Sequence, residues 1–222
     1  MDNGYLALAD WRRRVAQIYA EWRHASATDP HGAWLRWRGA RDELFRVHPQ
    51  SPLKPQMRAR FGGLSYFDFD PAYRFTVKFE AADSESDPHA PDSPAGGLLQ
   101  LPSSGAEQLS FRRIGLVRLA GPLEGATLPV FWMSGYAGGI FLPFRDVTSG
   151  TATYGAGRYL LDSVKGADLG SDWQGGEMTL DFNLAYHPSC AYDPKWNCPL
   201  APPQSRMTLP VNAGERLEEL AE

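Results

Sequence analysis

The sequence predicts a mainly β, α+β fold, in which an antiparallel β-barrel or sandwich carries two N-terminal helices packed on it. Apolar residues recur at helical spacing up to about residue 48, and the apolar period changes to two from residue 61 onward. In addition, 22 glycines and 18 prolines among 222 residues favour many turns and short strands. We expect residues 1–60 to form a helical segment and residues 61–222 a β-rich domain, together one structural unit.

Two helices are expected in the N-terminal segment. The apolar stripe of the first consists of Leu8, Trp11, Val15, Ile18, Tyr19 and Trp22. Thr28-Asp29-Pro30 predicts the start of the second, because an N-cap side-chain oxygen binds free N–H groups and Pro fits the first turn. His48-Pro49 predicts its end, since a residue before proline is pushed out of the α region. Residues 1–48 should therefore be mostly helical.

Strands are expected in the remainder of the chain. Residues 74–80 alternate apolar with polar side chains, which predicts a half-buried strand, and residues 64–69 should be its hairpin partner. Further strands are expected at residues 98–101, 108–120, 128–133, 139–144, 153–161 and 177–182. Residues 62–211 should thus be mostly strand. Residues 83–97, rich in Asp, Ser, Pro and Gly, predict a mobile loop.

Composition argues against several classes of protein. The net charge of −4 is unfavourable for a nucleic-acid surface, so no nucleic-acid partner is expected. The sequence contains no run of about 18 apolar residues, so no membrane span is expected. The N-terminal residues lack the apolar core and cleavage site of a signal peptide, so we expect a soluble, cytoplasmic protein.

Two segments, residues 143–159 and 180–192, are richer in polar residues than simple strands require. Together with neighbouring stretches they resemble the motifs of the domain of unknown function 1684 family. The matches are FRDVTSG at 144–150 to F-x-D-x-T-S-G, TYGAGRY at 153–159 to T-Y-G-x-G-R-Y, residues 181–192 to D-F-N-x-A-Y-N-P-x-C-A-Y, Cys198-Pro199-Leu200 with Pro202-Pro203 to C-P-L-P-P, and residues 213–215 to A-G-E. RDELF at 41–45 also resembles one of the family's earlier blocks.

The chain departs from this pattern in places. His187 stands where the family has Asn, and Gln204-Ser205-Arg206 stands where it has Glu-Asn-Arg. Because Gln204 replaces the Glu, this position cannot supply a carboxylate as an acid or base in this chain. The family has no established activity, so the resemblance implies a fold and motif boundaries but no mechanism.

The first hypothesis for function is a small-molecule pocket in the β domain, with an anion as the first candidate ligand. We expect Arg158, Asp181, Asn183 and Tyr186 to line it, with Asp146 supporting Arg158, and Trp132, Phe144 and Tyr159 to supply apolar walls. Asp181 and Asn183 should share one face of a strand, because they alternate with Phe182. The fork of Arg158 fits a carboxylate or phosphate with two hydrogen bonds. If the protein is an enzyme, carboxylate acid–base chemistry is the class that its residues support.

The alternative is a non-catalytic interaction or structural protein whose polar motif is internal scaffolding. Asp146 then caps a turn, and a buried Arg158 pairs with Asp146 or Asp181 because a buried guanidinium needs a partner. In that case the tryptophan-rich helical segment is the contact surface. On either hypothesis we expect Arg158 to be largely buried and bonded to at least one of these carboxylates.

Neither a metal nor another cofactor is expected. His187, Cys190 and Cys198 supply at most three ligands, whereas a structural zinc site needs four. We expect no nearby basic group that would lower a thiol pKa, and hence no catalytic thiol. In a cytoplasmic chain the free thiols are favoured over a disulfide.

Overall fold

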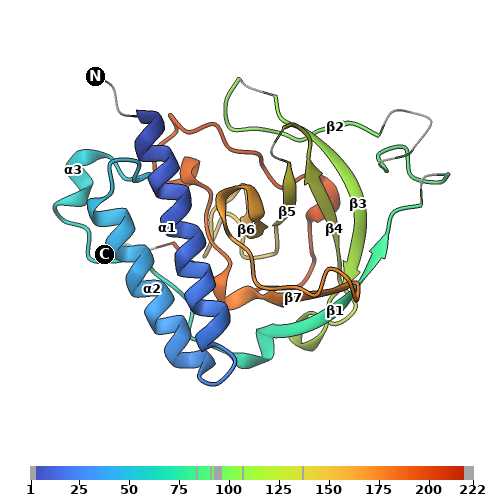
Figure 1. The fold of residues 1–222 in the computed structure, drawn as a ribbon, viewed down its shortest axis with the longest axis horizontal. Helices are drawn as coiled ribbons and strands as arrows, with labels where there is room; N and C mark the ends of the chain where they lie inside the picture. Colours follow the sequence, from blue (N-terminus) through green and yellow to red (C-terminus); the bar gives the residue numbers. More distant parts are fainter. Residues whose placement is uncertain are drawn as a thin grey trace.

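Two long helices and one curled antiparallel sheet make up most of the fold in the computed structural model (Figure 1). The structure describes residues 4–83, 85–90, 92, 97–106, 108–136 and 138–217. The sheet curls into a half-barrel, and the two helices lie side by side along its open side. A mainly β fold with two N-terminal helices is therefore confirmed.

The helices follow the sequence signals closely. Helix α1 spans Gly4–Ala25 and α2 spans Pro30–Val47. The Asp29 carboxylate accepts the N–H of Gly32 at 2.9 Å, and Pro30 occupies the first turn. A short helix, α3 (Pro55–Arg58), follows. The expectation of a mostly helical N-terminus is confirmed over residues 4–48, and no helix in the described ranges is long and apolar enough to cross a membrane.

The sheet contains short strands in the order β6-β5-β4-β3-β1-β7, with β2 paired to β3. Their bounds are β1 Arg74–Ala81, β2 Leu99–Gln100, β3 Ser110–Arg118, β4 Thr127–Met133, β5 Gly139–Phe144, β6 Arg158–Asp162 and β7 Glu177–Asp181. All named pairs are antiparallel. The expectation that residues 62–211 are mostly strand is wrong, because the strands make up less than half of this range. They have two to nine residues each and are separated by turns and 3-10 segments.

The expected hairpin partner of β1 is wrong. β1 pairs with β7 and β3, whereas residues 64–69 make only an isolated bridge, Tyr66 to Glu215. The N–H of Phe67 donates to the Gly214 carbonyl at 2.9 Å, so this segment pairs with the C-terminal segment instead. Of the expected loop at 83–97, residues 84, 91 and 93–96 lie outside the described residues.

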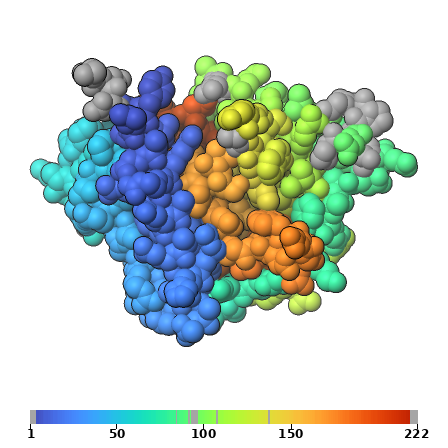
Figure 2. Space-filling view, viewed as in Figure 1, coloured from blue at the N-terminus to red at the C-terminus, as the bar shows by residue number. Residues whose placement is uncertain are grey.

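The open side of the half-barrel is closed by a bridge and by the helices. Tyr159 in β6 and Tyr186 exchange two backbone hydrogen bonds, of 2.8 and 3.0 Å. Helix α1 lies on the surface beside the segment after β6 (Figure 2), where Arg23 donates to the Asp168 carbonyl at 2.7 Å. Trp34 in α2 reaches over the edge and donates to the Asn183 carbonyl at 3.2 Å.

The tryptophans of the helices face the core. Trp22, Trp34 and Trp37 are only 2%, 4% and 2% exposed. They pack in the main hydrophobic cluster with side chains of the sheet. These three rings are buried inside this chain, so a contact surface on the helical segment, part of the alternative hypothesis, would use other side chains and stays a prediction.

Strand β3 is irregular where it crosses β1 and β4. Its pairing with β4 shifts between Arg113 and Gly115. A Cβ on Gly115 would lie 2.3 Å from the Glu80 carbonyl oxygen and 2.5 Å from the Phe79 ring. The absence of a side chain at Gly115 thus lets the strands approach at the bulge.

We predict that Gly115→Ala destabilises the protein by at least about 2 kcal/mol, because its methyl group has no room. Gly39→Ala is the control, since a Cβ there meets nothing within 4 Å and Gly39 lies within α2. It should stabilise by about 0.5–1 kcal/mol through helix propensity. Chemical denaturation measures both, and equal stability of the two variants would contradict this account of the bulge.

Candidate functional site

Arg158 is the centre of a buried polar network. It is the first residue of β6, and its side chain is 0% exposed. The guanidinium donates to the Val211 carbonyl at 2.9 Å and also to the Ala213 carbonyl, and lies 3.5 Å from Asp146 Oδ2. Burial lowers the pKa of Arg158 to about 10, so the side chain is still charged at neutral pH. The expectation of a buried Arg158 bonded to a carboxylate is confirmed.

Asp146 has all of its hydrogen-bonding capacity in use. Its Oδ2 accepts the N–H of Val211 at 2.6 Å, and its carboxylate accepts the hydroxyls of Thr148 at 2.9 Å and Ser149 at 3.2 Å. The residue therefore caps its own turn and pairs with Arg158 at the same time. This saturation is what the scaffold hypothesis predicts for it.

Asp181 and Asn183 lie in a separate cluster. Asp181 Oδ1 accepts the backbone N–H and the side-chain amide of Asn183 at 3.0 and 2.9 Å. Asn183 bonds in turn to both backbone groups of Asp70, each at 2.9 Å. The expectation that Asp181 and Asn183 share a face of one strand is wrong, because β7 ends at Asp181 and a 3-10 turn, Phe182–Leu184, begins there. Burial raises the pKa of Asp181 to about 6.

A buried Arg41–Glu215–His187 cluster links α2 to the sheet. Arg41 donates to Glu215 at 2.9 Å and to the Tyr66 hydroxyl at 3.0 Å. The N–H of His187 donates to the same Glu215 oxygen at 3.2 Å, and Glu215 is 1% exposed. Burial raises the pKa of Glu215 to about 7, although the positive charge of Arg41 acts to lower it.

His187 is held neutral in this cluster. Its Nε2 accepts the backbone N–H of Tyr154 at 3.2 Å, so the ring proton lies on Nδ1, 3.5 Å from Glu215. Burial, reinforced by Arg158 and Arg41, lowers the pKa of His187 to about 3. The sequence reasoning missed Arg41 and Glu215 as partners, although both lie in stretches that resemble family motifs.

Tyr186 lies apart from the other expected site residues. Its ring stacks on the Arg41 guanidinium, with 5.0 Å between the guanidinium carbon and the ring centre. It lines a cavity of about 50 Å³ between the helices and the sheet, together with Tyr19 and His187. A cavity of this volume holds a few water molecules. The structure thus brings Arg158 and Asp146 together, places Asp181 with Asn183, and leaves Tyr186 at this small cavity.

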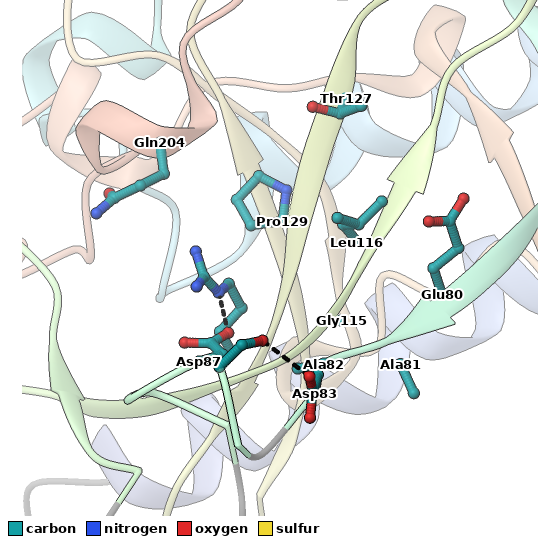
Figure 3. Close-up of a pocket in the computed structure, with 12 residues that line it drawn as sticks. Glu80, Ala81, Ala82, Asp83, Asp87, Gly115, Leu116, Thr127, Pro129 and Gln204 are labelled. Carbon is teal, nitrogen blue, oxygen red and sulfur yellow. Dashed lines mark hydrogen bonds and ion pairs between the residues drawn. The ribbon is translucent and has the colours of Figure 1, made fainter. Parts of the chain in front are cut away.

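The larger groove in Figure 3, of about 400 Å³, crosses β1, β3 and β4. Its charged side chains are satisfied within the chain. Arg113 bonds to Asp87, Ser86 donates to Asp83 at 3.0 Å, and Glu80 pairs with Arg118 at 2.7 Å. The groove therefore presents few groups in need of a ligand.

A cavity of about 190 Å³, here called the arginine cavity, differs in this respect. It is lined by Pro102, Arg145, Ala156, Leu200, Ala201, Pro203 and Arg206. Arg145 and Arg206 are partners in a parallel bridge, so their side chains leave the same face. Backbone hydrogen bonds of 2.9 Å to Ser205 and 2.8 Å from Met207 hold the two segments together.

Neither guanidinium of the arginine cavity has a partner in the part of the chain that the structure describes. No hydrogen bond or ion pair joins the side chain of Arg145 or Arg206 to another described residue, and Arg145 Nε is buried without a partner. Like charges on neighbouring bridge partners repel each other. The cavity is therefore a basic site without an internal counter-ion.

The sequence reasoning chose the buried neighbour of Arg145 instead of Arg145 itself. Asp146 is buried and pairs with Arg158, whereas the adjacent Arg145 lines the cavity. Arg145 lies inside the stretch that matches F-x-D-x-T-S-G, and Arg206 occupies the Arg position of Glu-Asn-Arg. The signal that could have found Arg206 is a motif arginine without a nearby carboxylate in sequence, whereas Arg145 adjoins Asp146 and carries no such signal.

Comparison with known proteins identifies no activity. The family described as protein of unknown function (DUF1684) matches residues 59–216. The chain is also similar to an uncharacterised protein of Haloarcula marismortui whose solution NMR structure is known, with 32% identity, a TM-score of 0.56, and coverage of 87% of this chain and 97% of that one. No curated protein matches the chain.

We predict that Arg158→Ala costs about 3–5 kcal/mol of stability, because it leaves a buried carboxylate and carbonyl groups unpaired. Arg158→Lys should not restore it, since one ammonium group cannot reproduce the planar fork. Arg12→Ala, at an exposed position, is the control and should change stability by less than about 0.5 kcal/mol. Urea denaturation measures all three. A loss below about 1 kcal/mol for Arg158→Ala would rule out the scaffold role.

A second prediction concerns pH. The pKa of Glu215 is about 7 in the folded protein and lower when unfolded, so the folded state takes up the proton first as pH falls. This stabilisation is fully present below about pH 4.5 and is lost as pH rises to 7, by up to about 3 kcal/mol. Wild type should therefore lose stability relative to Glu215→Gln as the pH rises from about 4.5 to 7. Parallel pH profiles of the two proteins would contradict the buried carboxyl assignment.

Proposed function

The chain belongs to the DUF1684 family of proteins of unknown function, and we propose that it binds a small anionic molecule in the arginine cavity. The observation that carries the proposal is the pair Arg145 and Arg206, which line one cavity with no counter-ion among the described residues. An anion between them would relieve their repulsion and would satisfy the buried Nε of Arg145.

The size and lining of the cavity indicate the kind of ligand. At about 190 Å³ it is smaller than typical drug-sized pockets of about 300–1,000 Å³, so it suits a molecule of few atoms. Two guanidinium forks match the oxygens of a phosphate or a carboxylate. The proline, leucine and alanine side chains of the wall would contact an apolar part of the ligand.

In this proposal the five site residues that were expected from the sequence do not line the arginine cavity; they stabilise the fold around it. Arg158 and Asp146 hold the turn that carries Arg145, while Asp181 and Asn183 bind each other. Asn183 also bonds to Asp70, and Tyr186 contacts Arg41 of α2. The lining contains no carboxylate, and Gln204 stands where the family pattern has Glu. We therefore propose binding without acid–base chemistry. The cytoplasmic location and the absence of nucleic-acid, metal and cofactor partners stay predictions.

We predict that inorganic phosphate raises the thermal midpoint of the wild-type protein by about 5–10 °C at a concentration about a hundredfold above its Kd. Arg145→Met and Arg206→Met should each lose most of this shift, because one fork alone binds weakly. Each should also raise the midpoint without phosphate slightly, since the like-charge pair is gone. Sodium chloride at equal ionic strength and acetate serve as the comparison ions in the same assay.

Arg12→Met is the matched control, because Arg12 is exposed and does not line the cavity. It should keep the full phosphate shift, which separates site binding from general salt stabilisation. An equal phosphate shift in wild type and in both cavity variants would refute the proposed site. A larger shift with acetate than with phosphate would instead identify a carboxylate as the ligand group.

A further inference from the structure

The small cavity between the helices and the sheet is a second place where side chains have unused hydrogen-bonding groups. This cavity of about 50 Å³ is here called the tyrosine cavity. Its lining includes the polar side chains of Tyr19, Arg41, Lys165, Tyr186 and His187, with Trp11, Phe45 and Tyr159 as aromatic walls. It shares no lining residue with the arginine cavity, so the two sites can be tested separately.

Two of the three tyrosines in this lining have a hydroxyl without a partner. The Tyr159 hydroxyl donates to the Pro199 carbonyl and is therefore used within the fold. Among the described residues, no hydrogen bond joins the hydroxyl of Tyr19 or Tyr186 to another group. Trp37 packs edge to face on Tyr19, but its indole has only an N–H to offer and cannot accept the hydroxyl proton. Both hydroxyls are thus available as donors.

The charged groups in the lining are both cations. Arg41 uses Nε to bind Tyr66 and Nη2 to bind Glu215, which leaves Nη1 without a partner among the described residues. The Lys165 ammonium lies 3.4 Å from Asp162 Oδ2 and has two further N–H groups to donate. Neither Glu215 nor Asp162 belongs to the lining, which contains no carboxylate. The cavity therefore presents donors and positive charge to a ligand.

We propose that the tyrosine cavity binds a small planar monovalent oxyanion of the size of formate or nitrate. The oxygens of such an ion are acceptors, so they match the unused O–H groups of Tyr19 and Tyr186 and the N–H groups of Arg41. Because the cavity holds only a few water-sized groups, it has room for an ion of this size and little room for a tetrahedral phosphate.

The exposure of the lining indicates how the anion enters. The Lys165 side chain is 39% exposed, whereas Arg41 is 8% and Tyr19 only 1% exposed. The Lys165 ammonium also lies 5.8 Å from the centre of the Tyr159 ring, so it stays beside the cavity wall. An anion from solvent would meet this ammonium first and the two buried groups afterwards.

Isothermal titration calorimetry of the full-length protein with sodium formate and with sodium nitrate, at constant ionic strength, tests the proposal. Wild type should bind the anion at a saturable site. Tyr19→Phe and Tyr186→Phe should each weaken binding by about tenfold, because each removes one hydrogen bond to a charged ligand. Both variants should fold as wild type does, since neither hydroxyl has a partner among the described residues.

Two controls assign the binding to this cavity. Tyr5→Phe alters a tyrosine that is exposed and outside the lining, so it should keep the wild-type affinity. Arg145→Met should also keep it, because Arg145 lines only the arginine cavity. The anion that binds more tightly shows whether a carboxylate or an inorganic oxyanion is the better ligand.

Three outcomes would overturn the proposal. One is the absence of saturable binding of both anions by wild type, and another is an unchanged affinity in both Tyr19→Phe and Tyr186→Phe. The third is loss of binding in Arg145→Met, which would assign the anion to the arginine cavity. None of them decides whether phosphate binds Arg145 and Arg206, which the thermal assay measures separately.

Discussion

One buried cation, the guanidinium of Arg158, holds together three parts of the chain. Its N–H groups bond to carbonyls at Val211 and Ala213 and lie near Asp146, so β6, the turn after β5 and the C-terminal segment meet at one point. The same C-terminal segment delivers Glu215 to Arg41 of α2. The docking of the helices therefore depends on a segment that Arg158 positions. A buried charge of this kind is expensive unless its hydrogen bonds are nearly complete.

The parts of the fold that could be predicted from sequence are those set by local rules. The two helices follow from apolar spacing, the cap at Asp29 and the proline after His48. Strands β1 and β3–β5 follow from alternation and their flanking turns. The partner of residues 64–69 could not be predicted, because it is the segment around Gly214, at the other end of the chain. Pairing between distant segments depends on tertiary packing that local patterns do not encode.

The candidate site shows the same division. The pairing of Arg158 with Asp146 followed from the rule that a buried guanidinium needs a carboxylate. Asp181 and Asn183 were placed on a strand face because the change to a 3-10 turn at Phe182 has no strong local signal. Arg145 and Arg206 meet only through a bridge between distant segments, so their shared cavity could not be seen before the fold was known.

The central claim is that the arginines have different roles. Arg158 stabilises the fold from the interior, whereas Arg145 and Arg206 are proposed to bind an anion in the arginine cavity. The most direct test is a proton–nitrogen correlation spectrum of the arginine Nε–H groups, recorded while inorganic phosphate is added. The account predicts that the resonances of Arg145 and Arg206 shift with a common saturation curve, while that of Arg158 stays in place and exchanges slowly with solvent. A shift of Arg158 with unchanged resonances of Arg145 and Arg206 would contradict it.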